Sequence, residues 1–168
     1  MKRIFLIALT IMGIMGTAQA QNILGSTERK ALKEFQDTRL PEIKKAMESA
    51  VSFSFELEVK WDQIAESGRS EFYNNDDYWV KPIFNPIIKG LEMVASDDIG
   101  KKNLKAKLKK IVVFYDDKVK SNKRVGYLNN FEFNNGVLTV NLQPFSNLDE
   151  TPVKEKAEAL QKFLESKI

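Results

Sequence analysis

Paired carboxylates are the residues of this sequence best suited to chemistry. Four acidic doublets occur, at Asp76-Asp77, Asp97-Asp98, Asp116-Asp117 and Asp149-Glu150. Such pairs can bind calcium or share the acid–base work of glycoside hydrolysis. No doublet has the alternating spacing of a calcium loop, and each falls where a predicted helix starts or a loop turns, so helix capping also accounts for it. A catalytic pair would have to be assembled from distant parts of the chain.

The chain contains no histidine and no cysteine, which removes most other chemistry. Ser-His-Asp and Cys-His catalysis, imidazole and thiolate metal ligation, and disulfides all need one of these residues. No Gly-rich phosphate loop, Gly-x-Ser-x-Gly elbow, Ser-x-x-Lys pair or metal signature is present. The sequence therefore predicts no catalytic residue, no metal ligand and no cofactor, and it favours a protein that is not an enzyme.

An aromatic and acidic segment offers a candidate binding site. Flat rings beside amides and carboxylates suit sugars or peptides, because the rings stack on the ligand while the polar groups orient it. The segment is rich in Asn and Asp, so we expect an exposed loop, and its candidate binding residues are Tyr73, Asp76, Asp77, Tyr78 and Trp79. The preceding Trp61 shares the apolar face of a predicted strand and is assigned to the core.

Lysines are concentrated between positions 101 and 124. A patch for phosphate-bearing polymers and an ordinary solvated helix face are the two interpretations. The helical lysines lie outside the apolar stripe of Ile99, Leu104 and Leu108, and few aromatics lie among them, which favours the solvated face. Two of the chain's 26 basic residues fall in its first three positions, and the other 24 are balanced by 23 acidic ones. That near-neutral balance disfavours nucleic acid as a partner.

The first 20 residues have the three parts of a secretory signal peptide. They are a basic start at Lys2 and Arg3, an apolar run over 4–16, and an Ala-x-Ala end at Ala20. A membrane-spanning helix needs about 20 apolar residues, so a cleaved signal is favoured over an anchor. We expect cleavage after Ala20 and a single domain over 21–168, located in the periplasm or secreted, without a transmembrane span. The missing lipid-acceptor cysteine argues against a lipoprotein.

The element expected to organise the fold is the segment 51–61. Apolar side chains fill every odd position from Val51 to Trp61, and polar ones fill every even position. Because side chains alternate across a strand, this pattern predicts a long strand with one buried face and one face open to solvent or to a partner.

Helical and strand patterns elsewhere complete the predicted architecture. Helical spacing is found at 26–50, with a break expected at Pro41, and in several later segments. Asn135-Gly136 between two alternating segments is a strong hairpin signal. We therefore predict an α+β fold in which helices pack on one face of an antiparallel sheet of about four strands, at 51–61, 110–115, 127–133 and 137–142.

Together these patterns predict an exported small bacterial protein that works as a non-enzymatic binding or interaction domain. Its ligand would be a protein or an envelope polymer. The alternative is a carboxylate-dependent hydrolase acting on an envelope glycan or polymer. Two carboxylates facing each other across a deep cleft, about 5–10 Å apart, would favour that alternative.

Overall fold

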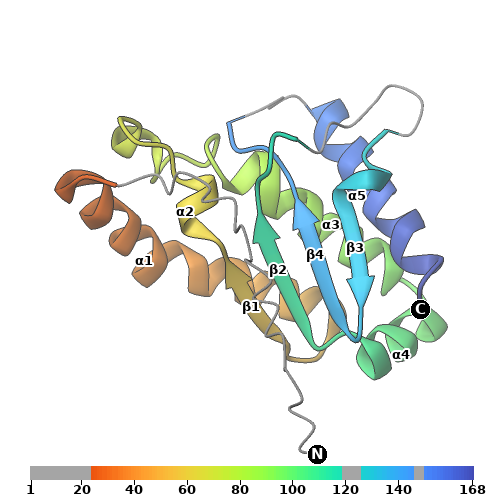
Figure 1. The fold of residues 1–168 in the computed structure, drawn as a ribbon. Helices are drawn as coiled ribbons and strands as arrows, with labels where there is room; N and C mark the ends of the chain where they lie inside the picture. The colour runs from red at the N-terminus through yellow and green to blue at the C-terminus, as the bar shows by residue number, and fades with distance from the viewer. Residues whose placement is uncertain (1–23, 119–125, 146–149) are drawn as a thin grey trace, which may run out of the picture.

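The computed structural model describes residues 24–118, 126–145 and 150–168. Within these ranges the chain is α+β, with five α-helices and one four-stranded sheet (Figure 1). The helices are α1 (Ser26–Val51), α2 (Trp61–Ile64), α3 (Asn85–Val94), α4 (Asp98–Lys107) and α5 (Glu150–Glu165). The strands are β1 (Glu56–Val59), β2 (Lys110–Phe114), β3 (Phe131–Asn134) and β4 (Val137–Asn141). None of the helices in these ranges has the length and apolar character needed to cross a membrane.

The strand predicted at 51–61 is wrong in its extent, because only Glu56–Val59 is strand. Val51 is the last residue of α1, which ends where Ser52 adopts a left-handed conformation with φ of 63°. Trp61 begins the short helix α2. Alternation predicts which side chains share a face, but a residue such as Val51 reaches the same core from a helix end.

The sheet is mixed rather than antiparallel. Its strand order is β1-β2-β4-β3, in which β1 pairs with β2 and β2 with β4 in parallel, while only β3 and β4 are antiparallel. The chain between β1 and β2 carries α2, α3 and α4, and such a helical connection returns the next strand in a parallel direction. The predicted strands at 110–115, 127–133 and 137–142 become 110–114, 131–134 and 137–141.

The predicted hairpin is confirmed between β3 and β4. Asn135 and Gly136 have φ angles of 53° and 88°, so both lie in the left-handed region that a two-residue type I′ turn needs. The closing pair is Asn134 with Val137. This turn fixes the register along the whole of β3.

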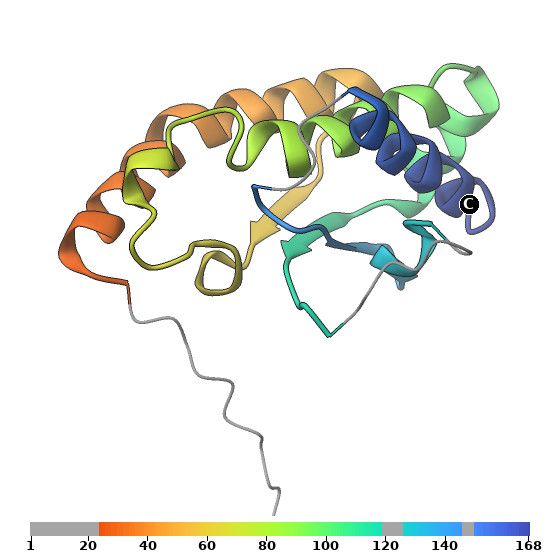
Figure 2. The ribbon, with the colours of Figure 1, turned by 90° about the horizontal axis from the view of Figure 1, so that it is seen from above.

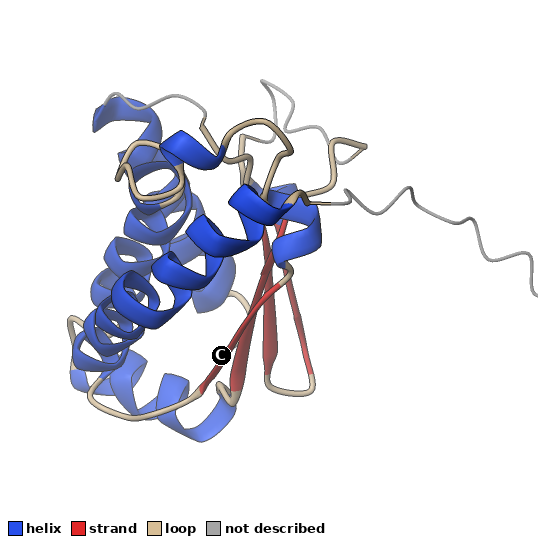
Figure 3. Cartoon of the chain, turned by 90° about the vertical axis from the view of Figure 1, so that its left-hand side faces the viewer, coloured by secondary structure: helices blue, strands red, loops and turns tan. Residues whose placement is uncertain are grey.

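Helices cover one face of the sheet, as expected. Seen from above, α1, α3 and α5 lie side by side on one side of the strands, and the side view shows the same two layers (Figures 2 and 3). Ile111 and Val113 of β2 and Leu138 and Val140 of β4 point into this layer and are fully buried. In the described part of the chain, no helix covers the opposite face.

Helix α1 runs unbroken through Pro41, against the prediction of a break there. A proline inside a helix removes one backbone hydrogen bond. The helix nevertheless keeps one buried stripe on both sides of Pro41, formed by Leu32, Phe35, Ile43, Met47 and Val51. Packing of that stripe offsets the lost bond.

Two prolines four residues apart shape the segment that enters α3. Pro82 and Pro86 lack N–H groups, so the carbonyls of Tyr78 and Pro82, four residues earlier in each case, receive no helical hydrogen bond from them. The backbone N–H of Phe145 donates to the Tyr78 carbonyl at 2.8 Å. The Lys156 ammonium donates to the Pro82 carbonyl at 3.1 Å. The C-terminal part of the chain is thereby attached to the start of α3.

Candidate functional site

The three aromatic residues of the predicted binding site are buried. Tyr73 and Trp79 have no exposed surface, and Tyr78 is 1% exposed. The expectation that they lie on an exposed loop is therefore wrong. The Trp79 ring contacts Phe35 and Trp61 at centroid distances of 4.8 and 5.2 Å, so it joins α1 to α2. Asn and Asp around these rings reach solvent while the rings themselves turn inward.

Both tyrosines are held neutral by their surroundings. Burial is the main cause that raises the pKa of Tyr73 to about 12, and burial also raises the pKa of Tyr78. The Tyr73 hydroxyl donates to the carbonyl of Glu66 at 2.6 Å, and the Trp79 ring N–H donates to the carbonyl of Ile64 at 3.2 Å. The polar ring atoms of Tyr73 and Trp79 thus satisfy neighbouring backbone carbonyls, whereas the buried Tyr78 hydroxyl has no hydrogen-bond partner among the described residues.

The acidic residues of the predicted site face cations instead. Asp76 is exposed and pairs with Arg39 of α1, while Asp77 is half-buried and pairs with Lys81. The Asp77 carboxylate raises the pKa of Lys81 by accepting a hydrogen bond from it. The five predicted residues therefore divide into a buried ring cluster and two separate surface ion pairs, and they do not line a common pocket.

A helix cap and a loop turn account for the first residue of each of the two acidic doublets that the structure describes in the later half of the chain. Asp97 is the N-cap of α4, where its side chain accepts from the backbone N–H of Gly100 at 2.7 Å. Asp116 accepts from the N–H of Lys118 at 2.9 Å. The doublet at 149–150 begins outside the described residues. Within the described ranges, no group of three or more carboxylates could hold a metal ion.

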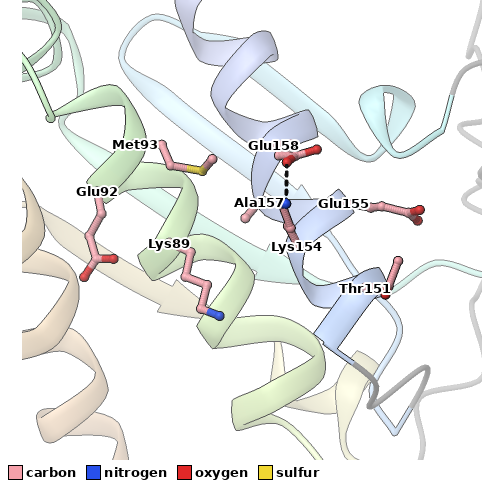
Figure 4. A pocket seen from close by; sticks show the side chains of 8 residues that line it. All are labelled: Lys89, Glu92, Met93, Thr151, Lys154, Glu155, Ala157 and Glu158. Carbon is pink, nitrogen blue, oxygen red and sulfur yellow. Dashed lines mark ion pairs between the residues drawn. The ribbon is translucent and has the colours of Figure 1, made fainter.

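A groove of about 690 Å³ between α3 and α5 carries several charged side chains (Figure 4). Glu155 points away from the α3 side of the groove, and Glu158 is paired with Lys154 at 3.8 Å. Glu92 points outward from α3. These carboxylates do not face one another across a cleft. The groove lacks the arrangement that a two-carboxylate hydrolase requires.

The open face of the sheet carries a network of ion pairs on β1 and β2. Lys110 lies 2.7 Å from a carboxylate oxygen of Glu56 and 2.5 Å from one of Glu58, and Glu58 also contacts Lys60. The hydrogen bond from Lys110, followed by that from Lys60, lowers the pKa of Glu58 to about 2. Glu56 and Glu58 raise the pKa of Lys110. Glu58 and Lys110 therefore stay charged across the physiological pH range.

Apolar side chains lie beside this network on the same face. Val112 and Phe114 of β2 point away from the helices, and Val137 of β4 is paired with Lys110 in the register. All three are half-buried. We call Val112, Phe114 and Val137 the apolar strip. Glu132 of β3 is exposed at its other flank, so the strip lies between charged side chains of the two edge strands.

The sequence prediction named the polar side of β1 but missed the apolar strip. The run Ile111–Phe114 is uninterrupted in apolar character, so alternation does not show which of its residues point outward. Lys110 belongs to the lysine-rich run at 101–124, and as the first residue of β2 it places its charge on the sheet. The predicted apolar stripe of α4 is wrong at Ile99, whose side chain is 74% exposed rather than buried.

No protein-family model, no curated protein sequence and no solved structure matches this chain. The class that the geometry defines is therefore a small α+β domain with one helix-covered face and one open, apolar-centred sheet face.

Proposed function

We propose that the chain is an exported, non-enzymatic interaction domain that binds a partner protein on the open face of its sheet. The observation that carries this proposal is the apolar strip on a face that no described helix covers. A protein interface typically has an apolar centre with a polar rim, and the strip with its flanking ion pairs has that composition. Location in the periplasm or outside the cell follows from the predicted signal peptide and belongs to the same proposal.

The state of the ionisable groups supports binding rather than catalysis. A carboxylate with a pKa of about 2, such as Glu58, is a poor general acid or base near neutral pH. Tyr73 and Tyr78 have raised pKa values and are buried. The alternative of a carboxylate-dependent hydrolase gains no support from the divergent carboxylates of the α3–α5 groove.

Charge argues for the chemistry of the partner. Glu56, although paired with Lys110, has a side chain that is 66% exposed, and Glu132 is exposed on the opposite flank, so carboxylates reach the solvent at both sides of the strip. Lys110 is already engaged by two carboxylates. We therefore expect a protein surface with an apolar centre and a basic rim, rather than an anionic polymer.

The test is site-specific photocrosslinking in the producing cell. A photoreactive residue is placed at Val112 on the open face, and the matched control carries it at the exposed Lys45 of α1 on the helical side. We expect one protein adduct that depends on position 112. The adduct protein is then purified and titrated against residues 21–168.

Phe114→Ala should weaken that binding by about fivefold or more, since truncating a central apolar interface residue costs about 1–3 kcal/mol. Lys45→Ala should leave it unchanged. Equal adducts from both positions, no protein adduct at position 112, or an affinity indifferent to Phe114→Ala would each contradict the proposal. Crosslinking to glycan alone would point to the envelope-polymer interpretation and also contradict it.

A further inference from the structure

A second groove runs along the outer edge of β3, beside the C-terminal end of α5. Its volume is about 620 Å³. Leu128 is 37% exposed in it, and the Phe131 and Phe163 rings pack at 5.8 Å along its wall. Figure 1 shows β3 at the free edge of the sheet with α5 next to it. The lining residues are Leu128, Asn129, Phe131, Glu132, Lys162, Phe163, Ser166 and Lys167.

The hairpin register leaves backbone groups of β3 pointing into this edge. A two-residue type I′ turn makes Asn134–Val137 a hydrogen-bonded pair, and the bonding then alternates along the strands. Phe131 and Phe133 therefore direct their N–H and C=O groups away from β4. The N–H of Phe131 donates a hydrogen bond to the carbonyl of Leu128. Among the described residues, no hydrogen-bond partner is found for the Phe131 carbonyl or for the N–H and C=O of Phe133.

The groove combines this unpaired edge with apolar and cationic side chains on one side. Lys162 and Lys167 line the α5 side of the groove, and the Lys167 ammonium lies 5.7 Å from the centre of the Phe163 ring. Lys107 of α4 donates to the carbonyl of Lys167 at 3.2 Å and adds a third cation at the same end. Glu132, on the sheet side, carries the opposite charge.

We propose that this groove binds an extended segment of a partner protein, which adds to the sheet as a further strand beside β3. Backbone hydrogen bonds to Phe131 and Phe133 would hold the segment. Because side chains alternate along a strand, residues two apart in the segment face the helix side together. An apolar residue there covers Leu128 and Phe163, and an acidic residue pairs with Lys162. The intervening residues lie beside Glu132 and are basic or neutral.

This proposal concerns a surface separate from the apolar strip. The groove uses the backbone edge of β3 and the end of α5, whereas the open-face proposal uses side chains of β2 and β4. Failure of one proposal leaves the other standing. Val112→Ser, on the open face, therefore serves as a control that should not affect the groove.

The test begins with selection of a displayed library of random nonapeptides on residues 21–168. We expect enriched sequences with an apolar and an acidic residue two positions apart. An enriched peptide is then titrated into isotope-labelled protein and followed by NMR. Amide shifts should occur at Phe133 and Phe163 and not at Val112.

Three changes separate strand addition from other binding. Methylating the peptide's backbone nitrogens that face β3 should abolish binding, because the hydrogen bonds to the Phe131 and Phe133 carbonyls are lost. Lys162→Glu should weaken binding at least fivefold, while Lys154→Glu, an exposed lysine on the same helix outside the groove, should not. The Val112→Ser control should bind as the unmodified protein does.

Several results would overturn the proposal. They are failure to enrich any groove-dependent peptide, binding that tolerates backbone methylation, and equal effects of Lys162→Glu and Lys154→Glu. Concentration-dependent shifts of the Phe133 amide without peptide would show that a second copy of the chain pairs at this edge, which would also replace a foreign segment as the occupant.

Discussion

Lys156 offers a quantitative test of the packing of α5. It is only 2% exposed, its ammonium donates to the Pro82 carbonyl, and it lies 5.7 Å from the centre of the Tyr127 ring. No carboxylate among the described residues forms an ion pair with it. Burial lowers the pKa of Lys156 from 10.5 to about 8. The perturbation is Lys156→Met, which keeps an unbranched side chain one atom shorter and removes the charge.

The magnitude follows from that pKa. A shift of about 2.5 units at roughly 1.4 kcal/mol per unit corresponds to about 3 kcal/mol of folding free energy lost while Lys156 is charged. The folded state binds this proton less tightly than the unfolded chain, so stability must rise with pH through this range. Between pH 7 and pH 9.5 the expected rise is about 2 kcal/mol.

Few other groups titrate in this window. The chain contains no histidine and no cysteine. Burial raises the pKa of Tyr73 to about 12, and it also raises the pKa of Tyr78. Ionisation of these phenols therefore reduces stability only above about pH 10. The pH dependence between 7 and 9.5 is therefore expected to report Lys156.

The assay is urea unfolding of residues 21–168 at pH 7, 8, 9 and 9.5. Lys156→Met should flatten the rise of about 2 kcal/mol. At pH 7 it should be more stable by about 1 kcal/mol, because the charge penalty is partly offset by an unpaired Pro82 carbonyl, worth about 1–3 kcal/mol. Lys154→Met, on the same helix but exposed and paired with Glu158, should keep the rise. A flat profile in the unmodified protein, or an undiminished rise in Lys156→Met, would refute the reasoning.

Three further outcomes are expected. Gly90→Ala should destabilise by about 1–3 kcal/mol in urea unfolding, because the added methyl would lie 3.0 Å from the Leu160 Cβ where α3 crosses α5; unchanged stability would show that the helices can separate freely. Gly136→Ala should cost about 1–2 kcal/mol by the same measurement, because its φ of 88° suits glycine. Glu58→Gln should reduce the loss of stability between pH 4.5 and 2, because Lys110 lowers the pKa of Glu58 in the folded state and the stabilisation this gives is lost as the pH falls. An acid profile identical to that of the unmodified protein would contradict this.

Local features of the fold were predictable from sequence, and strand order was not. The type I′ hairpin follows from Asn135-Gly136, because few residue pairs adopt its two positive φ angles. The direction of β1 relative to β2 depends on how the long connection between them packs, and no local pattern records that. The antiparallel prediction failed for this reason, although the α+β class and the helix-covered face were correct.

The expected exposure of the aromatic candidate residues failed through a related limit of sequence patterns. Tyr78 and Trp79 lie among Asp and Asn, whose polarity indicates a surface segment. The polar groups belong to the outside of a turn that places the rings inside it. Composition averages over both sides of such a turn. Only contacts from distant elements, such as Phe35 of α1 against Trp79, decide which side a ring occupies.

The difference between β1 and β2 is the strongest argument that the open face has a partner. Both strands belong to one sheet, and the layer of α1, α3 and α5 lies on the same side of both. β1 follows the rule for a half-buried strand, with Glu56 and Glu58 on the uncovered side. β2 breaks it by placing Val112 and Phe114 there. A continuous apolar strand is typical of a sheet covered on both faces. The sequence of β2 is thus suited to a second layer, and a bound protein would supply that layer where the described helices do not.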